Sequence, residues 1–131
     1  MDKASVLDFL ESYNRCFYER DLKALREHYV DGSNFVFWDN HPNCDSTSLK
    51  DHLIKIERFF VNGKDSESGD IEPLIVDNPR IVICKNTALL TAMLRYASRP
   101  EPGVRSTFFL VYDTGRWKAA HIHHSFAPSE Q

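Results

Sequence analysis

Side chains that can donate or accept protons lie in or next to two β-prone segments of this 131-residue chain. The segment over residues 117–126 contains three histidines: His121, His123 and His124. Asp39 directly follows a short aromatic run over residues 35–38. Imidazole and carboxylate groups are the side chains that most often act as acids and bases near neutral pH. Polar groups planted in a curved sheet commonly line a pocket, so these residues indicate where function lies.

Asp39 has two interpretations. Strand alternation puts Phe35, Phe37 and Asp39 on one face. A carboxylate beside these rings and Trp38 would be poorly solvated, which would raise its pKa into a range useful for proton abstraction. The alternative is that Asp39 caps the turn over residues 40–42.

The histidines of residues 117–126 divide between two faces. Strict alternation groups His121 and His123 with Trp117, and places His124 on the opposite face, although a single bulge would reverse this. His121 and His123 could bind a metal with His41 as a third ligand. No carboxylate or cysteine stands at a diagnostic spacing, so we predict no metal site and no cofactor.

Composition excludes several classes of function. The net charge is −3 and no basic stripe is present, so nucleic-acid binding is not expected. No apolar run approaches the roughly 20 residues that span a bilayer, and no signal peptide is visible, which predicts no membrane partner. The three cysteines, Cys16, Cys44 and Cys84, lack a CxxC spacing and indicate free thiols in the cytoplasm.

The periodicities predict one α+β domain over residues 1–131. Helices are expected over residues 6–17, 22–29 and 49–60, with Asp21 and Ser48 as N-caps. Strands are expected over residues 35–38, 71–76, 81–84, 88–98, 105–112 and 117–126. Residues 64–70 and 99–103 are predicted loops, and residues 113–116 a hairpin turn.

Three segments carry a resemblance to a known fold family. They are NPRI at 78–81, AMLR at 92–95 and GRWKAAHIHHSFAP at 115–128. With the element order, they make the chain similar to the nuclear transport factor 2-like superfamily, closest to the association (hub) domain of calcium/calmodulin-dependent protein kinase II and to SnoaL-like families. The resemblance implies a cone-shaped fold in which three N-terminal helices pack on a curved antiparallel sheet.

The hub resemblance also implies a ligand pocket. Arg95 matches one of the hub's pocket arginines and His52 its helix histidine, while Phe108 and His124 replace two further arginines. Such a pocket could bind a small carboxylate, although it would carry less positive charge than the pocket of the hub domain. Two alternatives stay open. Arg95 could pair with an acid or point outward at a sheet edge, and His52 could be a solvated helix residue.

A resemblance to ketosteroid isomerases points to chemistry. Those enzymes place a tyrosine on the first helix eight residues before the aspartate that opens the second, and Tyr13 and Asp21 repeat this spacing. Asp39 lies two residues beyond the position of their general base. The resemblance implies Asp39 as base and Tyr13 as oxyanion donor. In an enzyme of this type a pocket histidine such as His124 could replace Asp39 as base, and Arg95 would anchor the substrate. Phe37 and Trp38 are expected to contact the ligand. Tyr13 could instead be a core residue.

Three hypotheses follow for the function. We favour a cofactor-free acid–base enzyme of the isomerase, dehydratase or cyclase type, acting on a small, partly apolar molecule. The alternatives are a non-catalytic domain that binds a small acid, and an oligomerisation module like the kinase hub. In each case we expect at least a homodimer through the outer sheet face, because an open sheet with apolar residues on both faces needs a cover.

Overall fold

A computed structural model describes residues 1–32, 34–41, 43–63 and 72–131. Within these ranges the chain forms, in order, α1 (Lys3–Tyr18), α2 (Leu22–Arg26), β1 (Val36–Trp38), α3 (Leu49–Gly63), β2 (Leu74–Cys84), β3 (Thr87–Tyr96), β4 (Arg99–Asp113), β5 (Arg116–Phe126) and the short 3₁₀ helix η1 (Pro128–Glu130). The predicted α+β class is confirmed. The loop predicted at 64–70 and the start of the strand at residue 71 lie outside the described residues.

Each α-helix begins at a side chain that satisfies backbone N–H groups. Asp2 accepts a hydrogen bond from the Ser5 backbone N–H at the start of α1. Asp21 accepts from Ala24 N–H at α2, and Ser48 from the N–H of Asp51 at α3, so both predicted caps are confirmed.

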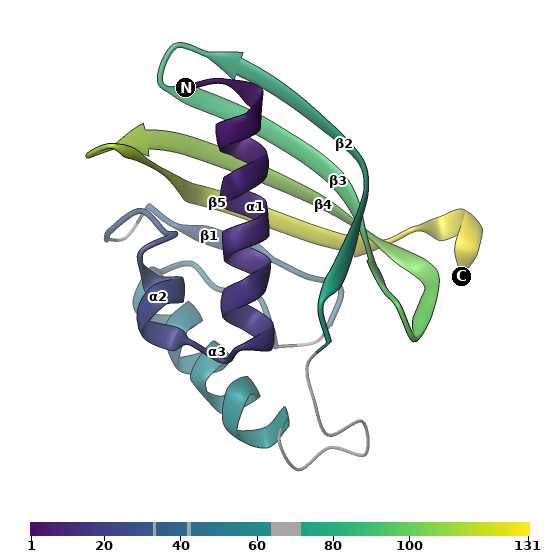
Figure 1. Cartoon of the computed structure of the whole chain (residues 1–131). Coiled ribbons are helices and arrows are strands. Elements are labelled where there is room, and N and C mark those ends of the chain that lie inside the picture. The colour runs from purple at the N-terminus through teal and green to yellow at the C-terminus, as the bar shows by residue number, and fades with distance from the viewer. Residues whose placement is uncertain (33, 42, 64–71) are drawn as a thin grey trace.

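The described strands form one sheet in the order β1-β5-β4-β3-β2. β1 runs parallel to β5, and every other neighbouring pair is antiparallel. The sheet is curved and unclosed, and α1 crosses the strands on one face, while α2 and α3 lie together beyond one end of α1 (Figure 1). We call the face toward α1 the inner face and the opposite one the outer face.

Three element boundaries differ from the sequence-based expectation. The two strands expected over residues 71–84 form a single β2, because a bulge at residues 77–80, with Asn78 at φ 51°, absorbs the Pro79 bend without ending the pairing. Residues 99–103 belong to β4 rather than to a loop. α2 ends at Arg26, and Tyr29 instead pairs in a bridge with Ala119 of β5.

A bulge in β5 decides which side chains face inward. Leu110 of β4 pairs with Ala119, and Phe109 pairs with His121, so Ala120 has no partner in the ladder. The alternation shifts by one residue at this point, and Trp117 therefore shares the inner face with His124. The expectation that Trp117 lies with His121 and His123 was wrong for this reason.

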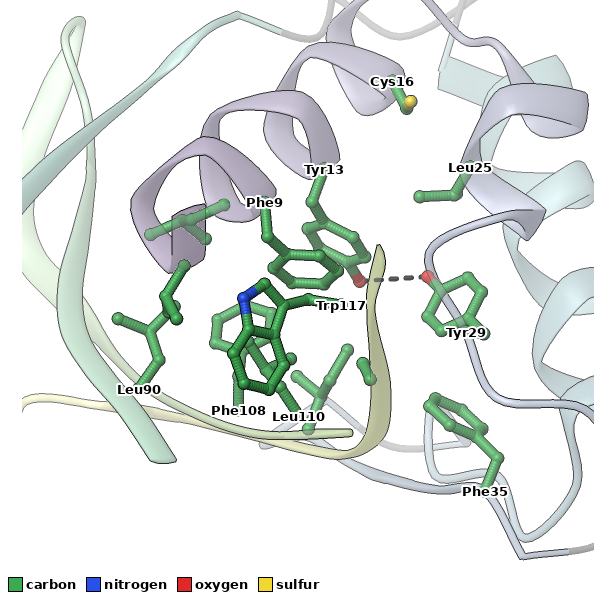
Figure 2. Packing of buried hydrophobic residues seen from close by; sticks show 14 of the residues in the cluster. Phe9, Tyr13, Cys16, Leu25, Tyr29, Phe35, Leu90, Phe108, Leu110 and Trp117 are labelled. Atoms are coloured by element: carbon green, nitrogen blue, oxygen red, sulfur yellow. Dashed lines mark hydrogen bonds between the residues drawn. The ribbon is translucent and has the colours of Figure 1, made fainter. Parts of the chain in front are cut away.

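The space between α1 and the sheet is filled with aromatic rings. Phe9 and Tyr13 of α1 stack at 5.8 Å between ring centroids, and both contact Phe108 of β4 (Figure 2). Trp117 donates its indole N–H to the hydroxyl of Ser5 at 2.9 Å, which ties β5 to α1. His28 packs on the rings of Phe9 and Tyr13, so this core also contains a buried polar residue.

Candidate functional site

A buried histidine and a partly buried one, from different elements, meet on the inner face around Phe37. His52 lies on α3 and His124 on β5, and the Phe37 ring of β1 contacts both, at centroid distances of 4.4 and 5.5 Å. We call His52, His124 and Phe37 the interior imidazole site. It joins α3, the edge strand β1 and the neighbouring strand β5, because His52 packs on Phe37 of β1 and β1 pairs with β5.

His52 is the most enclosed member of the site. It is 3% exposed, and its ring packs against Tyr29 at 5.3 Å and Phe35 at 4.9 Å. Its Nε2 is buried and makes no hydrogen bond with any described residue. Burial lowers the pKa of His52 to about 3, and the nearby His124 adds to this effect, so the ring is neutral at pH 7. The imidazole can therefore donate or accept one further hydrogen bond.

His124 is held by its neighbour on β4. Ser106 is its register partner, and the Ser106 hydroxyl lies 2.7 Å from Nδ1 of His124. The remaining ring nitrogen, Nε2, makes no hydrogen bond with the described residues. Burial lowers the pKa of His124 to about 4, and the charge of Asp39 opposes this shift. His124 is thus a neutral, oriented imidazole within electrostatic reach of a carboxylate.

Asp39 stands at the end of β1, next to this site. Its side chain is 19% exposed, and it accepts hydrogen bonds from Nδ1 of His41 at 3.1 Å and from the backbone N–H of Asn40 at 2.8 Å. These two hydrogen bonds fit the interpretation that Asp39 caps the turn after β1. The charge of Asp39 also acts on His124, where it opposes the lowering of the pKa of that ring.

Tyr13 lies in the aromatic core rather than beside Asp39. Its hydroxyl is 3.0 Å from that of Tyr29, and Figure 2 shows this pair beneath α1. Burial raises the pKa of both phenols. The ring of Phe108 contacts both Tyr13 and His124. The core interpretation of Tyr13 fits this placement, and the structure gives it no contact with Asp39.

Arg95 lies on the outer face. It pairs in register with the exposed Ile75, whereas the preceding Leu94 points inward and is 3% exposed. Its guanidinium binds the carboxylate of Glu130 through both terminal nitrogens, at 2.9 and 3.0 Å, and contacts Asp77 at 3.1 Å. The expected pocket arginine is therefore an outward residue with its own acids, which was the alternative interpretation.

Trp38 also lies on the outer face, because Phe37 takes the inward position of β1. Its ring contacts His121 at 5.2 Å and His123 at 5.6 Å. His41 lies with Asp39 and Phe126 instead of with those two histidines. Among the described residues, no group of three or more histidine, cysteine, aspartate and glutamate side chains is placed to hold a metal ion.

Sequence reasoning missed two residues of the site. Ser106 orients His124, and Tyr29 packs on His52. Ser106 stands two residues before Phe108, so strand alternation places both on one face and was a usable signal. Tyr29 carried no such signal, because its position depends on where α2 ends.

The family of the chain is settled by its sequence match. The model of the SnoaL-like domain matches residues 6–129. The chain belongs to the SnoaL-like family. A search of the curated proteins finds no match. None of the helices described for this SnoaL-like domain is long and apolar enough to cross a bilayer.

Solved structures agree with the fold of this SnoaL-like domain. A putative dehydratase of the NTF2-like family from Streptomyces avermitilis superposes with a TM-score of 0.77 at 14% identity, over 95% of this chain and 94% of that one. An NTF2-like protein of unknown function from Pseudomonas putida gives a TM-score of 0.75 at 14% identity, over 98% and 91%. A putative calcium/calmodulin-dependent protein kinase II association domain from Xanthomonas campestris gives 0.71 at 13% identity, over 98% and 89%. At these identities the likeness establishes the nuclear transport factor 2-like fold alone.

Proposed function

We propose that this SnoaL-like domain is a cofactor-free acid–base enzyme of the isomerase or dehydratase type. Its substrate is a small, partly apolar molecule that binds at the interior imidazole site. The observation that carries the proposal is Nε2 of His52, which is buried and has no hydrogen-bond partner in the described part of the chain. A buried polar atom without a partner is costly, and a ligand oxygen beside it would remove that cost.

The residues of the site suggest complementary roles. The neutral His52 ring donates a hydrogen bond to a carbonyl oxygen and stabilises the negative charge that develops there. Asp39 accepts a proton from the carbon next to that carbonyl. His124, oriented by Ser106, passes a proton to or from the substrate. Return of the proton at another carbon gives an isomer, and departure of a neighbouring hydroxyl with a proton gives water and an unsaturated product.

The charges around the site favour an uncharged substrate. Burial lowers the pKa of both His52 and His124, so neither ring supplies a positive charge at neutral pH. Asp39 adds a negative charge nearby, and Arg95 is paired with Glu130 on the other face. These groups argue for a ketone, enone or hydroxyketone over a carboxylate. They also weaken the alternative of a domain that binds a small acid.

Deuterium incorporation from D₂O tests this chemistry without knowledge of the natural substrate. Small cyclic ketones, enones and hydroxyketones are incubated with the protein, and loss of the protons next to the carbonyl is followed by ¹H NMR. We expect the wild type to accelerate exchange of at least one compound. Asp39→Asn and His124→Gln should each lower the rate by about 100-fold or more, since general acid–base groups contribute on this scale.

His121→Gln is the matched control for this experiment. It changes a histidine of the same strand that faces outward, where Nδ1 of His121 bonds the carbonyl of Val36. The control should retain the wild-type rate. Exchange in the wild type no faster than in buffer, for every compound, would remove the enzyme proposal. Equal rates in all three variants would remove the assignment to this site.

A further inference from the structure

A hollow lies between α1 and the edge strand β2, away from the interior imidazole site. Its volume is about 430 Å³. Leu7, Leu10 and Tyr18 line it from α1, and Leu74, Val76 and Pro79 from β2 and its bulge. This volume falls within the range of small-molecule sites, which is roughly 300–1,000 Å³, and such sites are mostly apolar with a few placed polar groups.

The polar group in this groove is the side-chain amide of Asn14. Asn14 lies in the middle of α1 and is 8% exposed, yet its amide makes no hydrogen bond to any residue in the described parts of the chain. Asparagine is a poor helix former, and its amide is not among the fully buried polar atoms of the described residues, so it is open to the groove. Packing alone would favour leucine at such a position. The amide offers one donor group and one acceptor to whatever occupies the groove.

The rim of the groove carries balanced charge. Glu11 and Arg15 line it one helical turn apart and form an ion pair at 3.0 Å. Among the described residues that line the groove, no uncompensated charge is therefore left to attract an ionic ligand. Leu7 and Tyr18 remain partly exposed, at 39% and 37%, so apolar surface extends toward both ends of the groove.

We propose that this groove is a second binding site, for a small uncharged molecule with an apolar body and one hydrogen-bonding group that pairs with Asn14. The site is independent of the proposed catalytic chemistry. It lies on the flank of α1 that faces β2, whereas the aromatic core and the interior imidazole site lie on the flank that carries Phe9 and Tyr13.

N-phenyl-1-naphthylamine is a suitable probe, because it is neutral, has two apolar ring systems and carries one N–H donor. Its fluorescence is titrated with the wild type and with three variants. Asn14→Leu keeps the side-chain size and removes the hydrogen-bonding group, so we expect binding about tenfold weaker. Val76→Phe fills the groove and should abolish binding. Ile54→Ala, in a separate groove between α2 and α3, is the control and should bind like the wild type.

Melting temperatures of the unliganded proteins supply a second readout. Asn14→Leu should melt a few degrees above the wild type, because it replaces an unpaired amide with an apolar group in a helix. A lower melting temperature would mean that the amide has a structural partner, and it would overturn the proposal. Absence of probe binding in the wild type, or equal probe affinity in the wild type and in Asn14→Leu and Val76→Phe, would overturn it as well.

Discussion

At the residue scale, the interior imidazoles link the site to the stability of the fold. Burial lowers the pKa of His52 to about 3 and of His124 to about 4, against an ordinary value of 6.5 for histidine. The unfolded chain therefore binds more protons than the folded one between these values. The stability that comes from the neutral rings is complete above about pH 6.5 and is lost as the pH falls toward 4 and then 3.

This coupling predicts a pH-dependent stability. The free energy of unfolding should fall between pH 7 and pH 5, by at most about 1.4 kcal/mol per pH unit for each of the two histidines. His52→Phe keeps an aromatic ring among Tyr29, Phe35 and Phe37 and should reduce that slope. Urea unfolding at a series of pH values measures it. Identical slopes in wild type and variant would contradict the lowered pKa of His52.

Glu130 titrates below the pH range of this measurement, so it does not contribute to the slope between pH 7 and pH 5. Its hydrogen bonds with Arg95 lower its pKa to about 2 from an ordinary 4.5. The contribution of this carboxylate to stability is present above pH 4.5 and is lost below it.

At the element scale, the pair formed by Arg95 and Glu130 holds the C-terminal η1 against the sheet. Glu130 binds Arg95 of β3 and accepts the backbone N–H of Gly103 of β4 at 2.8 Å. Gly103 suits this position, because a Cβ there would lie 2.6 Å from Sδ of Met93. One carboxylate thus joins the turn region of the β3–β4 pair to the end of the chain.

Glu130→Gln should therefore loosen a defined part of the sheet. We expect faster hydrogen exchange at the Gly103 amide, because the neutral amide side chain loses the charge-assisted bonds. Asp77→Asn is the control, since it breaks only the other ion pair of Arg95. Unchanged exchange at Gly103 in Glu130→Gln would show that Glu130 does not hold this region.

The sequence predicted the elements better than the directions of their side chains. Helix caps and the hairpin depend on local chemistry, so Asp21, Ser48 and the turn at residues 113–116 were predicted correctly. The direction of the side chains along β5 depends on a bulge at Ala120. The small apolar residues in this part of the sequence do not indicate a bulge. Strand alternation places Arg95 on the face opposite to Leu94, which is the outer face. The resemblance to the hub domain predicted instead that Arg95 points into a pocket.

At the scale of the whole molecule, the outer face carries a row of mostly apolar side chains. Residues in register across the sheet are Val82, Leu89, Phe109, His121 and Val36, one from each described strand. Val82, Leu89 and Phe109 are 64%, 43% and 39% exposed. Such a row on one face of an open sheet is an unfavourable surface for a monomer in water.

The homodimer expected from the sequence therefore remains our prediction. Light scattering coupled to size-exclusion chromatography should give about 30 kDa, twice the 15.2 kDa of one chain. The double variant Val82→Lys with Phe109→Lys should shift the protein to the monomer, because lysines buried at an interface would be unpaired. A monomeric wild type at high concentration would contradict the prediction.

The central claim is that His52 meets the oxygen of an uncharged substrate, and one matched comparison tests it most directly. The rate of deuterium incorporation into the most reactive ketone is measured for His52→Phe and for His121→Phe under the same conditions, because phenylalanine keeps a ring and removes the donor. The account predicts a loss of roughly 100- to 1,000-fold for His52→Phe, the scale of one lost oxyanion donor, and no change for His121→Phe. Equal rates in the two variants, with the wild type active, would contradict it.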